Sequence, residues 1–523
     1  MRAHEAREMD GTLIRAMLDP SFYPSRPAEV THVETHISHL FLAGDLVYKI
    51  KKPVRFSFLD YSTLRKRRYF LEEEMRLNRR LAPSVYLGIL PIAHENHSWR
   101  LGGEAHPVEY TLVMRRLPAR RMLDFLLDRD LVTPPMMGSI AEVLAPFHAQ
   151  AETGAEIQAN GHPKVIRTQW EENLADIEPL VGQSLEAEAF ERLKDFGLRF
   201  LIEHRDLFLR RVHEGRIREV HGDLHCEHIC FAPEGIQIFD CIEFNPRLRC
   251  CDVASEVAFL VMDLECRGAG GLAQDFLARY MELTDDREIP LLLPFYRCYR
   301  ALVRGKVAAL RRDDAWPQAA RYFDLAYRIL WQEFQPFLVL LCGLTGSGKS
   351  ALAAELSRRL GLPVISSDAI RKALAGSSER QDRLPYGEGI YSPSMTKRTY
   401  AKMAEDAGGF ISQGKGAILD ATFQRRAQRE RILSLAAKYQ IPLALIHCQS
   451  SEEVAQKRLK GREEEGRDLS DGRWEIYRQQ KADFEPIQET AEKIYLPLDT
   501  EAAPELLVRR AERFLFSRLK KRS

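Results

Sequence analysis

The sequence predicts two folded domains, an α+β domain followed by an α/β domain built on a parallel sheet. Residues 30–92 contain several short strand-like runs, and residues 123–331 have a mostly helical pattern. From residue 336 onward, short apolar strands alternate with helical segments, as is typical of a parallel sheet covered by helices. Because 523 residues are too many for one ordinary core, we expect a first domain at residues 1–331 and a second at residues 336–523.

The first domain should begin with a strand-rich region. Its expected strands are residues 30–34, 39–43, 46–51, 88–93 and 110–115. An amphipathic, charged helix at residues 64–81 lies between the third and fourth of these strands and stops before Pro83. The helical region that follows is interrupted by one strand–turn–strand segment, at residues 219–243.

The second domain should contain the five strands of the parallel sheet. They are expected at residues 337–342, 363–367, 417–420, 442–447 and 494–498. No flexible linker marks its start, and we place the boundary near residues 332–335.

The composition excludes several classes of protein. The chain has 76 basic and 75 acidic residues, so no global field attracts it to nucleic acid or to an anionic membrane. No apolar stretch approaches the roughly 18 residues that span a bilayer, and the N-terminus lacks the apolar core of a signal peptide. Nine scattered cysteines do not form a disulfide framework. We therefore expect a reduced, cytoplasmic protein.

Residues 343–350, with the sequence GLTGSGKS, match the phosphate-loop pattern G-x-x-x-x-G-K-S/T. A strand enters this segment and a helix leaves it, so backbone N–H groups and the helix N-terminus can bind phosphates. Lys349 should reach the β- and γ-phosphates of ATP, and the Ser350 hydroxyl should hold Mg²⁺. The predicted nucleotide-binding residues are Gly343, Thr345, Gly346, Ser347, Gly348, Lys349 and Ser350.

Asp368 and Arg371 follow the second strand of this domain. An aspartate at this edge of the sheet can accept a proton from an attacking hydroxyl group. An arginine one helical turn later can bind an anionic part of the acceptor. The alternative is a helix N-cap aspartate with a solvated arginine.

Asp420 ends the third strand, where it can order the water shell of the metal or bind the acceptor. Arg458, Arg462 and Arg467 follow the fourth strand on a charged helix and loop. They are candidates for a lid over the transferring phosphoryl group. The acidic residues 463–465 beside them suit a solvated helix face equally well.

Residues 337–498 resemble the small P-loop kinases, a group that includes polynucleotide 5′-hydroxyl kinase, gluconate-type kinases and zeta-toxin-like enzymes. The resemblance implies that Asp368 is the catalytic base, that Arg371 binds the acceptor and that Arg462 is the lid arginine. It does not identify the acceptor.

A second unusual segment, HGDLHCEH at residues 221–228, lies in the first domain. Asp223 follows a predicted strand there, and Asp240 follows 17 residues later at the end of the sequence Ile238-Phe-Asp. Such a pair can place a base for a hydroxyl group next to a ligand for the metal that bridges ATP phosphates.

Residues 30–327 resemble the aminoglycoside phosphotransferase family, which has a two-lobed, protein-kinase-like fold. The family signature is His-Gly-Asp, four residues, Asn, and then an aspartate on the following strand. The resemblance implies that Asp223 is the catalytic base, that Asp240 binds the metal and that Asp252 is mainly structural.

The small lobe also fits this resemblance. Lys49 on the third strand would bind the nucleotide, and Glu74 on the next helix would pair with it. Because side chains on a strand alternate between its two faces, Lys51 is as well placed as Lys49. Glu73 is the nearest competitor of Glu74.

His228 occupies the position of the metal-binding asparagine of that family. Imidazole is a poorer ligand for Mg²⁺ than an amide oxygen. Three alternatives follow: the metal site is altered with His228 as a ligand, Glu227 or Glu243 compensates, or the domain binds nucleotide without efficient turnover.

The residues around position 225 also permit a zinc hypothesis, but their spacing does not match a standard zinc pattern. They are His221, His225, Cys226, His228 and Cys230. Buried strand cysteines are the favoured explanation. The basic run at residues 65–68 is better explained as a solvated helix face than as a nucleic-acid site.

The sequence thus predicts an ATP- and Mg²⁺-dependent enzyme with two phosphotransferase modules that act on hydroxyl groups of small molecules. The alternative is a polynucleotide 5′-hydroxyl kinase in the second domain, with the first domain as a nucleotide-binding regulatory module. A nucleic-acid acceptor is not favoured, because we find no platform of aromatic and basic residues to hold a strand.

Overall fold

The computed structural model describes residues 11–56, 59–95, 97–102, 106–310, 316–376, 389–465, 474–489 and 492–519, apart from the side chains of residues 462–465 and 492. The chain divides into two compact units, Met1–Ala326 and Tyr327–Ser523. This division falls within helix α13 (Trp316–Gln332), whereas the sequence pattern places the boundary just after this helix.

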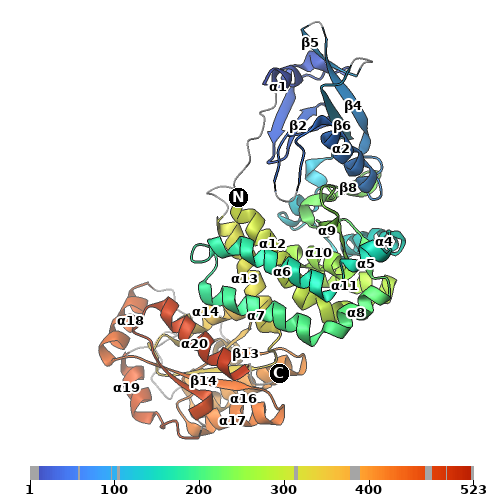
Figure 1. Cartoon of the computed structure of the whole chain (residues 1–523). Helices are drawn as coiled ribbons and strands as arrows, with labels where there is room; N and C mark the ends of the chain where they lie inside the picture. The colour runs from blue at the N-terminus through green and yellow to red at the C-terminus, as the bar shows by residue number, and fades with distance from the viewer. Residues whose placement is uncertain are drawn as a thin grey trace. The chain divides into compact units, whose positions relative to one another are not determined.

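Unit 1 contains a six-stranded antiparallel sheet with the order β1-β2-β3-β6-β4-β5 (Figure 1). Its strands are β1 Val30–Glu34, β2 Ser38–Ala43, β3 Leu46–Lys51, β4 Tyr86–Glu95, β5 Ser98–Leu101 and β6 Glu109–Arg115. Strands β1 and β3 have the bounds predicted from the sequence. Strand β5 was missed because an alternation of two apolar residues over four positions is too short to recognise.

Helix α2 (Leu64–Asn78) packs against strands β4 and β6. It begins at the N-cap residue Thr63, whose hydroxyl accepts a hydrogen bond from the backbone N–H of Lys66. The helix ends before the predicted residue 81, because the backbone N–H groups of Arg80 and Leu81 bond to carbonyls three residues back in a tighter turn. Helix α2 thereby presents Glu74 to strand β3.

The remainder of unit 1 is mainly helical, as predicted. Besides α1 Gly11–Leu18, its helices are α3 Leu123–Leu127, α4 Pro134–Gln150, α5 Ala155–Ala159, α6 Pro163–Ile177, α7 Ala187–Glu203, α8 Arg205–His213, α9 Pro246–Arg249, α10 Val253–Cys266, α11 Gly270–Thr284 and α12 Ile289–Leu310. Nearly all of α10 is buried, and it packs against α11 and α12. Helix α10 is therefore central to this core.

Two short antiparallel pairs of strands lie within the helical part of unit 1. Strand β7 (Ile217–Glu219) pairs with β10 (Cys250–Asp252), and β8 (Ile229–Ala232) pairs with β9 (Gly235–Ile238). The loops that leave β7 and β9 carry Asp223 and Asp240. The three residues of β10 were not predicted because they lie in a stretch with an otherwise helical pattern.

Unit 2 contains a five-stranded sheet with the order β12-β13-β11-β14-β15, in which every neighbouring pair is parallel. The strands are β11 Leu338–Cys342, β12 Val364–Ser366, β13 Ala417–Asp420, β14 Leu443–Gln449 and β15 Tyr495–Asp499. The helices are α14 Lys349–Leu360, α15 Ser367–Ala375, α16 Pro393–Ser412, α17 Arg426–Lys438, α18 Glu452–Glu465, α19 Trp474–Asp483 and α20 Pro504–Leu519. The α/β class with a parallel sheet, predicted from the alternation of apolar strands and helices, is confirmed.

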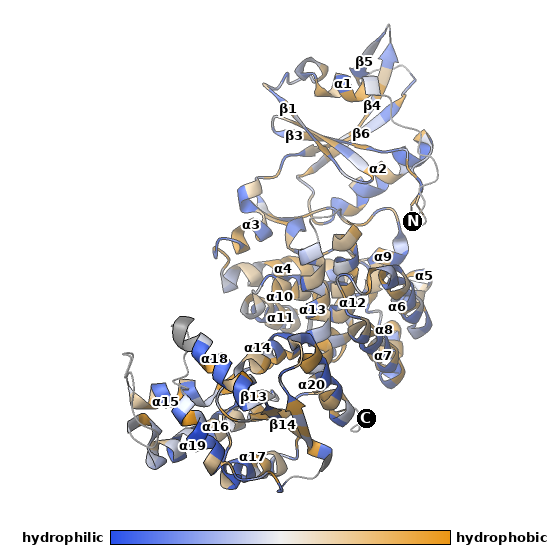
Figure 2. Cartoon of the chain, turned by 90° about the vertical axis from the view of Figure 1, so that its left-hand side faces the viewer, coloured by the Kyte–Doolittle hydropathy of each residue, from blue (hydrophilic) through white to orange (hydrophobic). Residues whose placement is uncertain are grey.

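Helices cover both faces of this sheet. Leu338 and Leu340 of β11 pack in one core cluster with Met403 of α16 and Ile432 of α17. Helix α14 contacts β11, β13 and α20. All five residues of β11 are buried, and Figure 2 colours the strand β14 as hydrophobic and helix α18 as mostly hydrophilic. A continuous apolar run, rather than an alternating one, is the pattern of such a two-sided buried strand.

Candidate functional site

The phosphate loop of unit 2 connects β11 to α14. Gly343, Gly346 and Gly348 all have positive φ angles, of 143°, 77° and 82°, which residues with a Cβ rarely adopt. A Cβ on Gly343 would lie 2.3 Å from the carbonyl oxygen of Cys448. The motif therefore requires glycine at position 343 both for its backbone conformation and for the close approach of β14.

Three polar side chains hold the backbone of this loop. The Thr500 hydroxyl donates to the carbonyl of Ser347 at 2.9 Å, and the backbone N–H of Thr345 donates to the Gln480 Oε1 at 2.9 Å. Arg458 donates to the Thr500 carbonyl at 2.6 Å. Arg458 thus binds Thr500, the residue that holds the loop, and this contact is at odds with the lid role considered for Arg458.

The chemistry-bearing residues of the loop lie at the start of helix α14. The Lys349 Nζ donates to the carbonyl of Leu344 at 2.8 Å, and the exposed Ser350 is the second residue of the helix. The Ser347 hydroxyl is buried and has no hydrogen-bond partner among the described residues. A buried hydroxyl donor without a partner, at the N-terminus of a helix, fits a bound phosphate group.

Asp368 and Arg371 lie on the first turns of α15. The N-cap of this helix is Ser366, whose Oγ accepts from the backbone N–H of Ala369, so the N-cap alternative for Asp368 is wrong. The Arg371 guanidinium donates to the Asp368 Oδ1 at 2.8 Å and lies 4.9 Å from the centre of the Tyr391 ring. The arginine is buried, not solvated, and it orients the carboxylate beside it.

One cavity of about 120 Å³ brings the phosphate loop and these acceptor-side residues together. Its lining includes Lys349, Ser350, Asp368, Arg371 and Asp420. The parallel register explains this, since the last residue of β13, Asp420, pairs with Leu341 of β11 and with Ser366 of β12. The strand ends therefore meet at one edge of the sheet.

Sequence patterns did not identify several polar residues that line the same cavity. They are Tyr391, Thr396, Tyr400, Thr422, Gln424, Gln428 and Gln480. The residues directly after β13 could have been found from their position behind a strand end. Two predicted lid residues cannot be placed in this way. The side chain of Arg462 and the whole of Arg467 lie outside the described part of the chain.

In unit 1, two lysines of β3 share one carboxylate of α2. The Lys49 Nζ lies 2.6 Å from the Glu74 Oε1, and the Lys51 Nζ lies 2.7 Å from the Glu74 Oε2. Lys49 also reaches the Oδ1 of Asp240 at 3.3 Å. Glu73 instead pairs with Arg76. Of the two lysine candidates, Lys49 is the one whose ammonium group also contacts the loop aspartate.

The loop that carries Asp223 is held from two sides. Glu256 of α10 accepts the backbone N–H groups of His221 and Gly222, at 2.7 and 2.9 Å. Arg300 of α12 donates to the Gly222 carbonyl at 3.0 Å. Burial raises the pKa of the Glu256 carboxyl to about 6. These contacts fix the backbone from which Asp223 projects.

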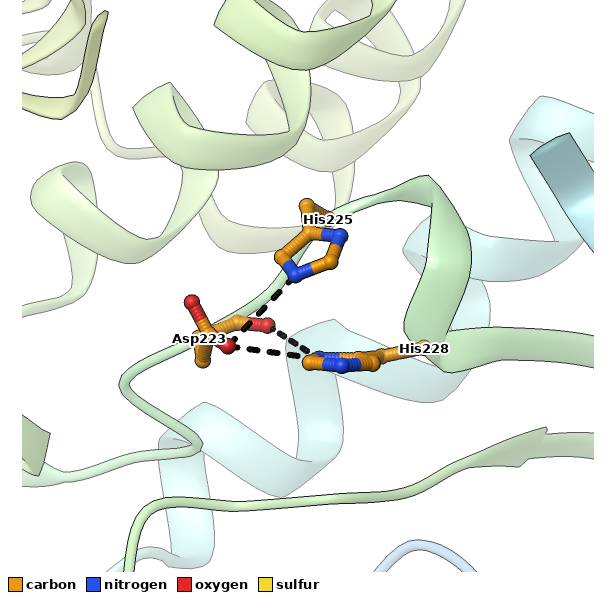
Figure 3. Close-up of side chains that lie close together, drawn as sticks. All are labelled: Asp223, His225 and His228. Carbon is orange, nitrogen blue, oxygen red and sulfur yellow. Dashed lines mark hydrogen bonds and ion pairs between the residues drawn. The ribbon is translucent and has the colours of Figure 1, made fainter. Parts of the chain in front are cut away.

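His225 and His228 both face Asp223 (Figure 3). The Asp223 Oδ2 lies 3.4 Å from the His225 Nε2 and 3.6 Å from the His228 Nδ1. Burial alone would raise the pKa of Asp223, but His225, His228 and Arg304 outweigh it and hold this pKa well below its ordinary value. Asp223 is therefore ionised at neutral pH.

Asp240 follows β9 in a left-handed conformation, with a φ of 64°. Burial opposes ionisation, but Lys49 and His228 lower the pKa of this carboxyl to about 2. Aspartate adopts this conformation more readily than most residues with a Cβ, and residues at positive φ recur at functional sites. The structure thus brings two ionised carboxylates, Asp223 and Asp240, to opposite sides of the His228 ring.

The acidic neighbours of His228 are occupied elsewhere. Glu227 pairs with Arg267 at 3.1 Å, and Glu243 accepts from Lys51 and from the Tyr61 hydroxyl. The hypothesis that one of these glutamates compensates at the metal position is therefore not supported by their geometry.

Other sequence interpretations can now be placed. Asp252 caps helix α10 and binds the buried Arg211, which fits a structural role. Among the described residues, the only group of three or more potential metal ligands is Asp223, His225 and His228, and it contains no cysteine. Within the basic run at residues 65–68, Arg67 is buried against Glu109, so this run is not wholly a solvated face.

A family model described as an AAA domain matches residues 338–487. The "Uncharacterized protein Rv2004c" of Mycobacterium tuberculosis is 32% identical over 439 residues, which cover 82% of this chain and 85% of that protein. The chain belongs to the family of this mycobacterial protein. The resemblance extends across both units.

Shorter matches concern unit 2. A shikimate kinase of Paramagnetospirillum magneticum is 33% identical over 88 residues, 17% of this chain and 45% of that enzyme. A solved gluconokinase structure from Sinorhizobium meliloti is 19% identical, covers 36% of this chain and 95% of that chain, and has a TM-score of 0.27. The family model and the match to shikimate kinase indicate that unit 2 is a P-loop kinase-like domain, and they support the prediction of an ATP-dependent kinase. None of the described helices is long and apolar enough to cross a membrane.

Proposed function

We propose that the chain is an ATP-dependent phosphotransferase with two kinase modules, each of which transfers the γ-phosphate of ATP to a hydroxyl group of a small molecule. The observation that carries this proposal for unit 2 is the cavity that Lys349, Ser350 and Asp368 line together. A nucleotide site and a candidate base in one cavity are what transfer to a separate acceptor requires, because the reaction depends on positioning and charge stabilisation.

Each residue of unit 2 has a stated task in this proposal. Asp368 accepts the proton of the acceptor hydroxyl group, and Arg371 positions Asp368 and binds the acceptor. Lys349 and the loop N–H groups bind the β- and γ-phosphates. Ser350 and Asp420 are oxygen donors of the kind that Mg²⁺ prefers, and the cation supplies neutralisation of phosphate charge when bound.

In unit 1, the proposed nucleotide lysine is Lys49, which Glu74 holds. Asp223 is proposed as the base and Asp240 as a metal ligand. Two contacts support these roles. Both carboxylates lie against the ring of His228, and Lys49 contacts Asp240. The ionised state of Asp223 suits an acceptor of protons.

Two alternatives lead to different results. A polynucleotide kinase in unit 2 is disfavoured by the cavity, whose only arginine among the described lining residues is Arg371, already paired with Asp368. A regulatory role for unit 1 is favoured by one observation, the imidazole at position 228. Under that alternative, unit 1 binds nucleotide but transfers no phosphate.

The test is a screen with radiolabelled ATP against hydroxyl-bearing metabolites, aminoglycosides and oligonucleotides. Wild type is compared with Asp368→Asn, with Asp223→Asn and with the control Asp406→Asn, whose carboxylate forms a partly exposed ion pair on α16. We expect one acceptor whose labelling is lost only in Asp368→Asn and another lost only in Asp223→Asn. Labelling that survives both substitutions would contradict both assignments, and labelling lost only with Asp368→Asn would favour the regulatory alternative.

A further inference from the structure

The ring of His228 has one nitrogen whose role the hydrogen bonds define. Its Nδ1 lies 2.9 Å from the backbone carbonyl oxygen of Asp223. A carbonyl oxygen only accepts, so the Nδ1 carries a proton and the neutral ring presents the lone pair of its Nε2 on the other side. A ring whose Nδ1–H is held by a backbone carbonyl is the usual arrangement of a metal-binding histidine.

The Nε2 of His228 faces a carboxylate. It lies 3.6 Å from the Oδ2 of Asp240, and both atoms of this pair are acceptors when the ring is neutral. Two neighbouring ligands that each lie about 2.1 Å from one cation are separated by about 3.0 Å in octahedral geometry and by about 3.4 Å in tetrahedral geometry. The observed separation therefore suits a shared cation. Lys49 occupies the other oxygen of Asp240, the Oδ1, and leaves the Oδ2 available.

The second grouping around this ring does not suit a cation equally well. Asp223, His225 and His228 have ligand atoms near one another. However, the guanidinium of Arg304 lies 3.2 Å from the His225 Nε2, so a positive group already occupies that side. The Nδ1 of His228 is also committed to the Asp223 carbonyl.

We infer that His228 Nε2 and the Asp240 carboxylate form a mixed nitrogen–oxygen site in unit 1 for a first-row transition-metal dication such as Mn²⁺, in preference to Mg²⁺. Imidazole nitrogen suits first-row transition-metal dications such as Zn²⁺ and Fe²⁺, whereas Mg²⁺ favours oxygen ligands; Mn²⁺ accepts both kinds of ligand and serves as the paramagnetic representative. Glu227 and Glu243 are engaged in ion pairs and supply no replacement oxygen. The inference rests on the proposed function of unit 1 as a nucleotide site, because nucleotide phosphates would complete the coordination sphere.

The experiment uses the full chain in a Lys349→Ala background, which weakens nucleotide binding in unit 2, with Mn²⁺ and a methylene-bridged ATP analogue. Pulsed electron paramagnetic resonance of Mn²⁺ detects directly bound nitrogen, and isotopically labelled histidine assigns it to imidazole. We expect an imidazole coupling in the parent protein that is lost in His228→Asn and kept in His225→Asn. The affinity for Mn²⁺ should fall on the order of tenfold or more in His228→Asn, while the affinity for Mg²⁺ falls less.

Each outcome decides a separate point. If Mn²⁺ binds with the nucleotide analogue but shows no imidazole coupling, or keeps it in His228→Asn, the inference is wrong and the proposed nucleotide site stands. If the analogue does not bind unit 1 at all, the proposed function of unit 1 fails, and the same spectra recorded with Mn²⁺ alone still test the histidine ligand. Absence of the coupling in the labelled parent protein refutes the inference without any variant, and retention of the coupling in His225→Asn shows that its loss in His228→Asn does not come from a general disturbance of this loop.

Discussion

Replacement of Glu74 by glutamine should destabilise unit 1 strongly, whereas the same change at the adjacent Glu73 should not. The Glu74 carboxylate is fully buried and accepts from Lys49 at 2.6 Å and from Lys51 at 2.7 Å, and the Lys51 side chain is also fully buried. Because Lys49 keeps Asp240 and Lys51 keeps Glu243 as partners, the substitution weakens two buried charge-assisted hydrogen bonds, at a cost of about 1.5–3 kcal/mol. Glu73 pairs with Arg76, whose side chain is 44% exposed, and more distantly with Arg249, which keeps Glu219 as its closer partner, so its neutralisation should cost about 1 kcal/mol.

The assay is urea denaturation of both variants and wild type, with free energies of unfolding from linear extrapolation. Hydrogen exchange of the peptides that span β3 and α2 assigns the loss to unit 1. The two substitutions are one residue apart and chemically identical, so each is the control for the other. Equal losses, or a larger loss for Glu73→Gln, would refute the assignment of Glu74 as the shared partner of both lysines.

Three further changes have defined outcomes. Gly343→Ala should abolish nucleotide binding by unit 2, since the added Cβ would lie 2.3 Å from the Cys448 carbonyl oxygen. Equilibrium dialysis with an ATP analogue measures the affinity of this site, and an unchanged affinity would contradict the loop geometry. His148 is buried against Tyr280, and burial lowers its pKa to about 3. Below pH 6.5 the unfolded chain therefore binds a proton at this residue that the folded chain does not bind, so the free energy of unfolding falls as the pH falls. His148 should lower the free energy of unfolding by about 2 kcal/mol between neutral pH and about pH 5. Urea unfolding of His148→Gln at several pH values should lack this part of the pH dependence, and an unaltered pH dependence would contradict the burial of a neutral ring. Arg211→Met should lower the free energy of unfolding by about 3–5 kcal/mol, because it strands two buried carboxylates that the arginine pairs with; a loss below about 1 kcal/mol in denaturation would show that the pairs are not formed.

The sequence predicted the architecture well where a physical pattern is local. The strand before the phosphate loop is continuously apolar because both faces of the parallel sheet are buried, and the glycines of the loop are required by positive φ. The short strands β5 and β10 could not be recognised, since three or four residues carry no periodic signal.

Contacts between distant residues set the limits of prediction for the site. Alternation along β3 could not decide between Lys49 and Lys51, because both reach Glu74 and only the approach of Asp240 distinguishes them. Likewise, the support of the phosphate loop by Arg458 depends on Thr500, which is distant in sequence. The residue types were visible in the sequence, but their partners were determined by the fold.

The central claim, that the chain carries one nucleotide site in each unit, is tested most directly by the binding stoichiometry of a non-hydrolysable ATP analogue. Equilibrium dialysis in the presence of Mg²⁺ or Mn²⁺ should give two molecules bound per chain for wild type and one for either Lys349→Ala or Lys49→Met. A stoichiometry of one for wild type that falls to zero in Lys349→Ala would contradict the account of unit 1.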